Sequence, residues 1–276
     1  SDGTVVNTTS NPGAIVNLAG NNVINGNIAL VNGGGGNGKI VSNGGTITIN
    51  GNIDSTGATG VRTLLIGGTS NGTINGLIAD ASFVTSLTKD GSGTWTLNAA
   101  NTFTGAVTVS AGTLQVNAIS AAGTAQPLGE ATGVVTLGTA TTSGTLEYTG
   151  NADATLARGI TVGGVGGGIV KNSGSGVLTL SGTITRASRP VTFTGGQIVV
   201  SGQITGASSN LNIDGATVTL SQTTNNYVGG TFVFGGGTLK NGASGVLTDS
   251  TTLTLGEATN NTNGTYDLNG FNETIT

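Results

Sequence analysis

The chain contains no cysteine, histidine or methionine among its 276 residues. The lack of cysteine excludes disulfide bonds and thiolate chemistry, and the lack of both cysteine and histidine excludes metal sites built on those ligands. Only 8 residues are lysine or arginine, and they are scattered singly, which excludes a basic patch for nucleic acid or anionic lipid. No apolar run approaches the roughly 18 residues of a membrane-spanning helix.

Charged and aromatic residues are also scarce. They make up 7% and 4% of the chain, with a net charge of −4 and a mean hydropathy of +0.16. A disordered chain has the opposite composition, with high charge and low hydrophobicity. Because there are so few aromatic side chains, the core must be built from aliphatic groups and threonine methyls. This favours a narrow core repeated along an axis over a wide globular one.

Glycine, threonine, asparagine and aliphatic residues make up most of the chain. Glycine occurs 52 times, without the three-residue period of collagen. Threonine and valine favour strands, whereas glycine and asparagine favour turns. Short strand–turn units fill the chain up to Ile78, for example Lys39–Val41 and Thr46–Ile49 around the turn Asn43-Gly44-Gly45. We therefore predict an all-β protein with essentially no helix.

The strand pattern is clearest from Leu87 to Val116, LTKDGSGTWTLNAANTFTGAVTVSAGTLQV. Alternating apolar and polar residues in Thr94–Asn98 and Ala106–Val109 predict two half-buried strands. The inward side chains are expected to be Trp95, Leu97, Phe103, Val107, Val109 and Leu114. The corners are expected at Gly91, Gly93, Gly105 and Gly112, because glycine tolerates positive φ.

This stretch recurs later in the chain. VTLSQTTNNYVGGTFVFGGGTLKN, residues 218–241, aligns with it, so that Phe103 corresponds to Tyr227 and Gly105 to Gly229. GTLEYTG at 144–150 likewise aligns with GTYDLNG at 264–270. Repeat units are therefore expected near residues 87–150 and 218–270. No linker separates them, and we predict one continuous solenoid over residues 1–276.

A solenoid follows from the physics of such repeats. One strand–turn coil cannot bury its inward face alone, but stacked coils cover each other's inward rows. With about 20–25 residues per coil, the chain is expected to form roughly a dozen coils.

Residues 87–116 and 218–276 resemble a known family. TKDGSGTWTLNAANTFTGAVTVSAGTLQV looks like the passenger-associated transport repeat, also called the autotransporter-associated β-strand repeat. TLTLG at 252–256 and GTYDLNGFNETI at 264–275 are similar to the segment that often follows it. The resemblance implies a right-handed parallel β-helix that is exported to the bacterial surface or medium. It implies no single activity, because fold alone does not give function.

Two glycine-rich tracts are candidate ligand sites. GGGGNGK at 33–39 fits seven positions of the phosphate-binding loop, but Ile40 stands where a Mg²⁺-binding hydroxyl is needed and no helix is expected to follow. GGVGGG at 163–168 lacks the aspartate of the calcium-binding nonapeptide. We interpret both tracts as turns and predict no cofactor and no metal site.

Carboxylates are the only candidate catalysts. Polysaccharide hydrolases use an acid and a base on opposite sides of the sugar. The candidate carboxylates are Asp80, Asp90, Glu130, Glu147, Asp153, Glu257, Asp267 and Glu273. The chain has only 12 acidic residues, none in a closely spaced pair, and no histidine to assist them. Glu147 and Asp267 occupy equivalent repeat positions, which favours an outward-facing structural role. We predict no catalytic residues, with a glycoside hydrolase or lyase as the alternative.

Five aromatic residues would stack on sugars if they were exposed. They are Trp95, Tyr148, Phe193, Tyr227 and Phe232. Most lie in alternating runs in which the inward phase is at least as compatible, so we predict core packing.

These observations favour a structural, non-catalytic extracellular protein that forms a surface fibre, sheath or stalk. Thr4–Val6 is strand-like, and Glu273–Thr276 is expected to stop in mid-strand. Unpaired strand edges template pairing with other chains, so we expect copies to stack head to tail. An adhesin passenger, or a β-helix that binds or degrades polysaccharide, is the alternative. The expected partners are further copies of the chain and, in the alternative, a polysaccharide, with no nucleic acid and no membrane span.

Overall fold

The computed structural model describes residues 14–31, 37–139, 141–164, 166–206, 209–248, 251–257 and 262–275. The chain divides into two compact units, Ser1–Gly133 and Val134–Thr276. All the regular structure of the described residues is β-strand, which confirms the predicted all-β class. Among these residues no helix has the length and hydropathy of a membrane span.

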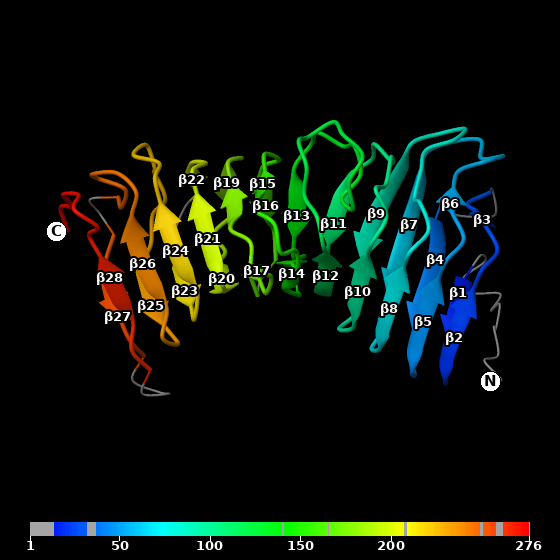
Figure 1. Cartoon of the computed structure of the whole chain (residues 1–276), viewed down its shortest axis with the longest axis horizontal. Helices are drawn as coiled ribbons and strands as arrows, with labels where there is room; N and C mark the ends of the chain where they lie inside the picture. The colour runs from blue at the N-terminus through cyan, green and yellow to red at the C-terminus, as the bar shows by residue number, and fades with distance from the viewer. Residues whose placement is uncertain are drawn as a thin grey trace. The chain divides into compact units, whose positions relative to one another are not determined.

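The first unit is a stack of coils whose strands pair in parallel with the strands of the next coil (Figure 1). Its strands are β1 (Ala14–Asn17), β2 (Asn21–Ile24), β3 (Ile28–Ala29), β4 (Asn37–Ser42), β5 (Thr46–Ile49), β6 (Ile53–Asp54), β7 (Arg62–Gly67), β8 (Asn71–Ile74), β9 (Thr85–Lys89), β10 (Thr94–Leu97), β11 (Val107–Val109) and β12 (Gly112–Val116). One face has the order β1-β4-β7-β9-β11, the second β2-β5-β8-β10-β12, and the third the short pair β3-β6. Strands consecutive in the chain therefore lie on different faces.

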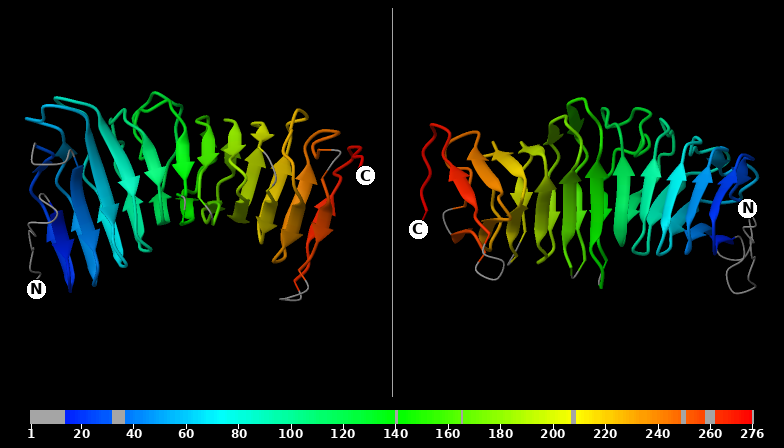
Figure 2. Two further views of the ribbon diagram at one scale, coloured as in Figure 1. Left: turned by 180° about the vertical axis from the view of Figure 1, so that it is seen from behind. Right: turned by 60° about the horizontal axis from the view of Figure 1, so that its bottom comes forward.

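The second unit follows the same plan with a longer third face. Its strands are β13 (Val135–Leu137), β14 (Gly144–Tyr148), β15 (Ala154–Leu156), β16 (Ile160–Val162), β17 (Gly168–Asn172), β18 (Leu178–Leu180), β19 (Ile184–Arg186), β20 (Val191–Gly195), β21 (Gln197–Val200), β22 (Ile204–Thr205), β23 (Leu211–Asp214), β24 (Thr217–Leu220), β25 (Thr231–Phe234), β26 (Thr238–Asn241), β27 (Leu253–Leu255) and β28 (Thr265–Asp267). The faces are β13-β16-β19-β22, β14-β17-β20-β23-β25-β27 and β15-β18-β21-β24-β26-β28. Figure 2 shows the neighbouring strands of each face side by side in both units.

The strand register shows how long each coil is. Thr96 of β10 and Gln115 of β12 are register partners in a short coil, with a sequence separation of 19. Asn50 and Asn75, which bond across two successive coils, have a separation of 25, within the predicted range. The described residues form about 10 turns, slightly fewer than the predicted dozen, because the longer coils and the loops take up more of the chain.

The core is the slim aliphatic interior that the alternation predicts. Every residue named above as inward in the stretch from Leu87 to Val116 is fully buried. Trp95 lies on β10, and its Nε1–H donates a hydrogen bond to the carbonyl oxygen of Gly67 at 3.1 Å. Because this donor is satisfied, the indole is buried without an unpaired polar atom.

A row of asparagines runs up one edge of the second face in the first unit. Asn50, Asn75 and Asn98 each donate a side-chain hydrogen bond to the asparagine of the preceding coil, at 2.8, 2.9 and 2.8 Å. Asn117 continues the row at 3.5 Å from Asn98, and Asn25 is its first acceptor. Each asparagine directly follows a strand of that face. We call these five residues the asparagine ladder, a stack known to stabilise parallel, in-register strands.

The predicted strand at Glu273–Thr276 is wrong over its described part, since residues 271–275 form no strand. Glu273 Oε2 accepts hydrogen bonds from the backbone N–H groups of Val246 at 2.9 Å and Leu247 at 3.3 Å, which hold this segment against a loop instead. Thr276 and Thr4–Val6 lie outside the described residues. The prediction of a single continuous solenoid stays a prediction.

Two repeat-equivalent glycines lie where successive coils approach each other closely. A Cβ at Gly105 would lie 2.3 Å from the carbonyl oxygen of Thr85, and a Cβ at Gly229 would lie 2.0 Å from that of Ser209. Both oxygens belong to the preceding coil, and Gly229 also has a φ of +132°. The repeat therefore requires glycine here because the coil below leaves no room for a side chain.

We expect Gly105→Ala to lower the free energy of unfolding by about 2–3 kcal/mol, because the added methyl must push two coils apart. Urea titration followed by circular dichroism would measure this. Gly60→Ala is the matched control, since a Cβ there meets nothing within 4 Å. Equal stability of the two variants would contradict the close-packing argument.

Candidate functional site

Several of the candidate carboxylates join one coil to the next. Asp80 Oδ1 accepts from the backbone N–H of Thr85 at 2.6 Å, while its Oδ2 accepts from the backbone N–H and hydroxyl of Thr104, at 3.1 and 2.6 Å. Asp153 Oδ1 accepts from the backbone N–H of Val177, in the next coil, at 2.8 Å. These carboxylates are therefore engaged in holding the solenoid together.

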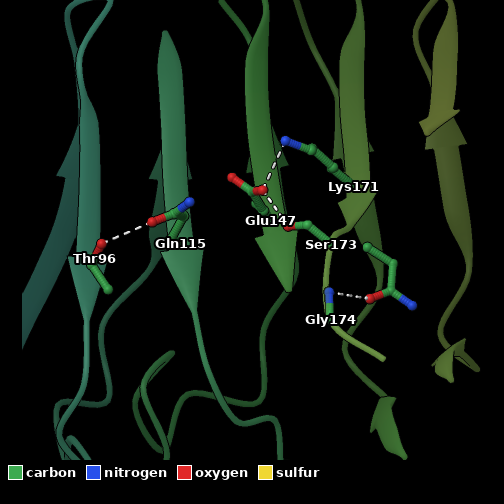
Figure 3. Close-up of polar contacts among 7 residues, drawn as sticks. Thr96, Gln115, Glu147, Lys171, Ser173 and Gly174 are labelled. Atoms are coloured by element: carbon green, nitrogen blue, oxygen red, sulfur yellow. Dashed lines mark hydrogen bonds and ion pairs between the residues drawn. The ribbon is translucent and has the colours of Figure 1, made fainter. Parts of the chain in front are cut away.

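Glu147 and Asp267, the repeat-equivalent pair, both form an ion pair with a lysine of an adjacent coil. Glu147 Oε1 lies 2.8 Å from the Nζ of Lys171, its register partner on β17, and also accepts from the hydroxyl of Ser173 (Figure 3). Asp267 lies 3.3 Å from Lys240, its register partner on β26. Glu147 is nevertheless buried, with 6% of its side chain exposed, whereas Asp267 is 42% exposed.

The electrostatics of the exposed pair agree with this structural role. The pKa of Asp267 is lowered first by a hydrogen bond from the backbone N–H of Asn269 and then by Lys240. The first unit carries a neutral counterpart, in which the Thr96 hydroxyl donates to Gln115 Oε1 of the next coil at 2.9 Å (Figure 3). In both units, polar side chains on the outer side of a strand thus form hydrogen bonds or ion pairs with side chains of the adjacent coil.

The described parts of both glycine tracts lead into strands. Gly33–Gly36 lie outside the described residues, and Lys39 and Ile40 belong to strand β4, so a strand follows the first tract in place of a helix. The second tract leads directly into β17 at Gly168, and its Val165 is outside the described residues. In the described residues no group of three or more acidic side chains is placed to hold a metal ion.

Lys89 is a chemically unusual residue that the sequence does not single out. It ends β9, is fully buried, and its ammonium donates hydrogen bonds to the carbonyl oxygens of Asp90 and Gly91, each at 2.8 Å, and Ala111, at 3.0 Å. Burial lowers its pKa to about 8, and the Asp90 carboxylate acts in the opposite direction. The lysine ties one corner of the solenoid to the corner of the next coil.

Four of the five candidate aromatics are in the core, as predicted. Trp95, Tyr148, Phe193 and Tyr227 are all buried. Phe232 is different: along β25 the side chains alternate between buried and part-exposed, and Phe232 and Phe234 take the part-exposed positions. The prediction of core packing is therefore wrong for Phe232.

The register explains the outward phase of β25. Leu211 and Ile213 of β23 face the core, and they pair with Thr231 and Val233. These two residues must therefore face inward as well, because the side-chain period of a strand is two. The buried Thr231 hydroxyl is hydrogen-bonded to the hydroxyl of Tyr227 at 2.8 Å, so the inward threonine has a hydrogen-bond partner in the core.

The two outward phenylalanines line a surface hollow of about 380 Å³. Its lining residues are Asn210, Asn212, Phe232, Phe234, Thr254, Gly256 and Glu257. Phe232 has Asn212 on one side and Thr254 on the other as register partners. The Phe232 ring also lies over Gly230, where a Cβ would come within 2.4 Å of ring atom Cε2. We call Phe232, Phe234 and the polar residues lining the hollow the aromatic platform.

The coil geometry agrees with what comparison with known proteins finds. Residues 87–116 and 214–240 match the model of the passenger-associated-transport-repeat. These two segments are similar to the repeat. In both, a strand is followed by a loop with a buried aromatic residue, Phe103 or Tyr227, and by two further strands. The transport repeat indicates a β-solenoid of the autotransporter passenger type. No curated protein and no solved structure matches the chain.

The lowered pKa of Lys89 predicts a specific dependence of stability on pH. Between about pH 8 and pH 10.5 the folded lysine has lost its proton while the unfolded chain keeps it, so the free energy of unfolding rises with pH in this window. Lys89→Met removes this titration. We expect the difference in unfolding free energy, wild type minus variant, to grow from about pH 7.5 to about pH 10. Urea titrations at each pH would measure this difference. A difference that stays constant or shrinks with pH would contradict the lowered pKa of Lys89.

Proposed function

We propose that this protein is a structural, non-catalytic solenoid that stands outside the bacterial cell as a rigid stalk or fibre. The observation that carries the proposal is the direction of its outward polar contacts. Side chains that would otherwise be available for chemistry bond to the neighbouring coil, as in the asparagine ladder and the Glu147–Lys171 pair. Such contacts stiffen the stack along its axis.

Export and composition support the same function. The transport repeats are typical of autotransporter passengers, which supports a surface or secreted location. A protein exposed outside the cell meets oxidants, and a chain without cysteine or methionine offers no sulfur to oxidise. Its lack of histidine also removes the side chain that ordinarily titrates near neutral pH.

End-to-end stacking of copies is the further part of this proposal. Parallel coils pair through the same backbone hydrogen bonds on either side, so the ladder that joins coils is also able to join chains. In the last described coils Leu255, Leu268 and Ile275 are 49%, 46% and 47% exposed. A coil of a second copy stacked on this face would cover these apolar side chains.

Electron microscopy of the purified chain at increasing concentration would test the stacking. We expect filaments in the wild type and their loss in Leu268→Lys, because the joint would then bury an unpaired charge. Val61→Lys is the control, since Val61 is 61% exposed and belongs to the first unit rather than to the last described coils. Single particles of wild type at every concentration, or filaments of Leu268→Lys equal to those of the control, would contradict the proposal.

A further inference from the structure

The aromatic platform departs from the surface around it. In the nearest coils the outward row through Phe232 carries Thr192, Asn212 and Thr254, and the row through Phe234 carries Thr194 and Asp214. One coil farther along, the two rows carry Ile169 and Lys171. Phe232 and Phe234 are both part-exposed on the same strand, so each leaves some apolar surface in contact with water. The fold does not need this exposed apolar surface. This position therefore calls for an explanation beyond folding.

The two transport repeats of the chain provide an internal comparison. When they are aligned on Gly105 and Gly229, Thr108 corresponds to Phe232 and Ser110 to Phe234. Between these two positions each repeat has an inward valine, Val109 in the first and Val233 in the second, and both valines are fully buried. The second repeat thus keeps the inward valine and has part-exposed phenyl rings where the first repeat has the part-exposed Thr108 and the buried Ser110.

The Phe232 ring contacts the backbone just before its own strand. It lies over Gly230, and a methyl group at that position would collide with Cε2 and lie 3.1 Å from Cζ. The Cε2 edge of the ring therefore lies against the backbone just before β25, and the ring contributes to the lining of the hollow. An aromatic ring has electron-rich faces, which favour contact with the slightly positive C–H groups of a ligand.

We propose that the aromatic platform binds a neutral carbohydrate chain. A sugar ring has an apolar C–H face that stacks on an aromatic ring, and an edge of hydroxyl groups. Asn210, Asn212 and Thr254 surround the rings with amide and hydroxyl groups, which both donate and accept hydrogen bonds. A purely apolar partner would cover these groups without satisfying them, at a cost in binding.

Charge selects neutral over acidic sugars. The described residues that line the hollow include the carboxylate of Glu257 but no lysine or arginine, and Asp214 stands beside Phe234 as its register partner. A uronate or sulfated sugar would meet like charge here, which disfavours binding. This inference adds a ligand to the proposed structural role and does not depend on it, because the platform lies on the side of the solenoid.

Affinity electrophoresis through gels that contain one polysaccharide each would test the proposal. The neutral probes are hydroxyethyl cellulose, mannan and soluble starch, and the acidic probe is polygalacturonate. We expect at least one neutral probe to retard the wild type, and the double variant Phe232→Ala/Phe234→Ala to weaken that binding by about tenfold. Phe83→Ala is the matched control, because Phe83 is 42% exposed in the first unit. Circular dichroism melting curves would show that all variants are folded.

Three results would overturn the proposal. The first is a wild type that no neutral polysaccharide retards. The second is a double variant that binds as tightly as Phe83→Ala. The third is wild-type binding to phosphatidylcholine vesicles that the double variant abolishes, which would assign the platform to a lipid surface. Stronger retardation by polygalacturonate than by every neutral probe would overturn the choice of neutral sugars.

Discussion

The parallel backbone ladder between successive coils is the interaction on which the structure depends. It fixes which residue of one coil lies beside which residue of the next, as with Trp95 beside Leu114. Because side chains alternate between the two sides of a strand, a slip of one residue would turn every inward group outward. The aliphatic interior and the asparagine ladder are both consequences of this register, since each stacks similar side chains directly on one another.

The close spacing of the coils also sets the limits on composition. Strands in a parallel sheet lie about 4.8 Å apart, so a corner of one coil presses on carbonyl oxygens of the coil beside it. Gly105 and Gly229 meet this constraint by having no side chain. Lys89 meets it in another way, because its buried ammonium satisfies carbonyl oxygens from two successive corners. A narrow interior of this kind needs few large aromatic side chains.

The sequence was sufficient to predict what depends on local pattern. Alternation identified the strands and the inward set from Trp95 to Leu114, and the internal repeat matched Phe103 with Tyr227, both buried. Features set by contacts between neighbouring coils were missed. The outward phase of Phe232 follows from its register with Asn212 in the preceding coil, and the burial of Lys89 from its contact with Ala111 in the following one. Alternation along a single strand carries no information about either.

The two transport repeats show why a shared fold leaves function open. Inward positions and close corners are constrained by the neighbouring coils, and there the two copies agree, as Val109 and Val233 do. An outward position does not face the packed interior, and it holds Thr108 in one copy and Phe232 in the other. A binding surface on a solenoid can therefore arise by substitutions along a single outward strand. The repeat indicates the scaffold, and the outward rows are where its two copies in this chain differ.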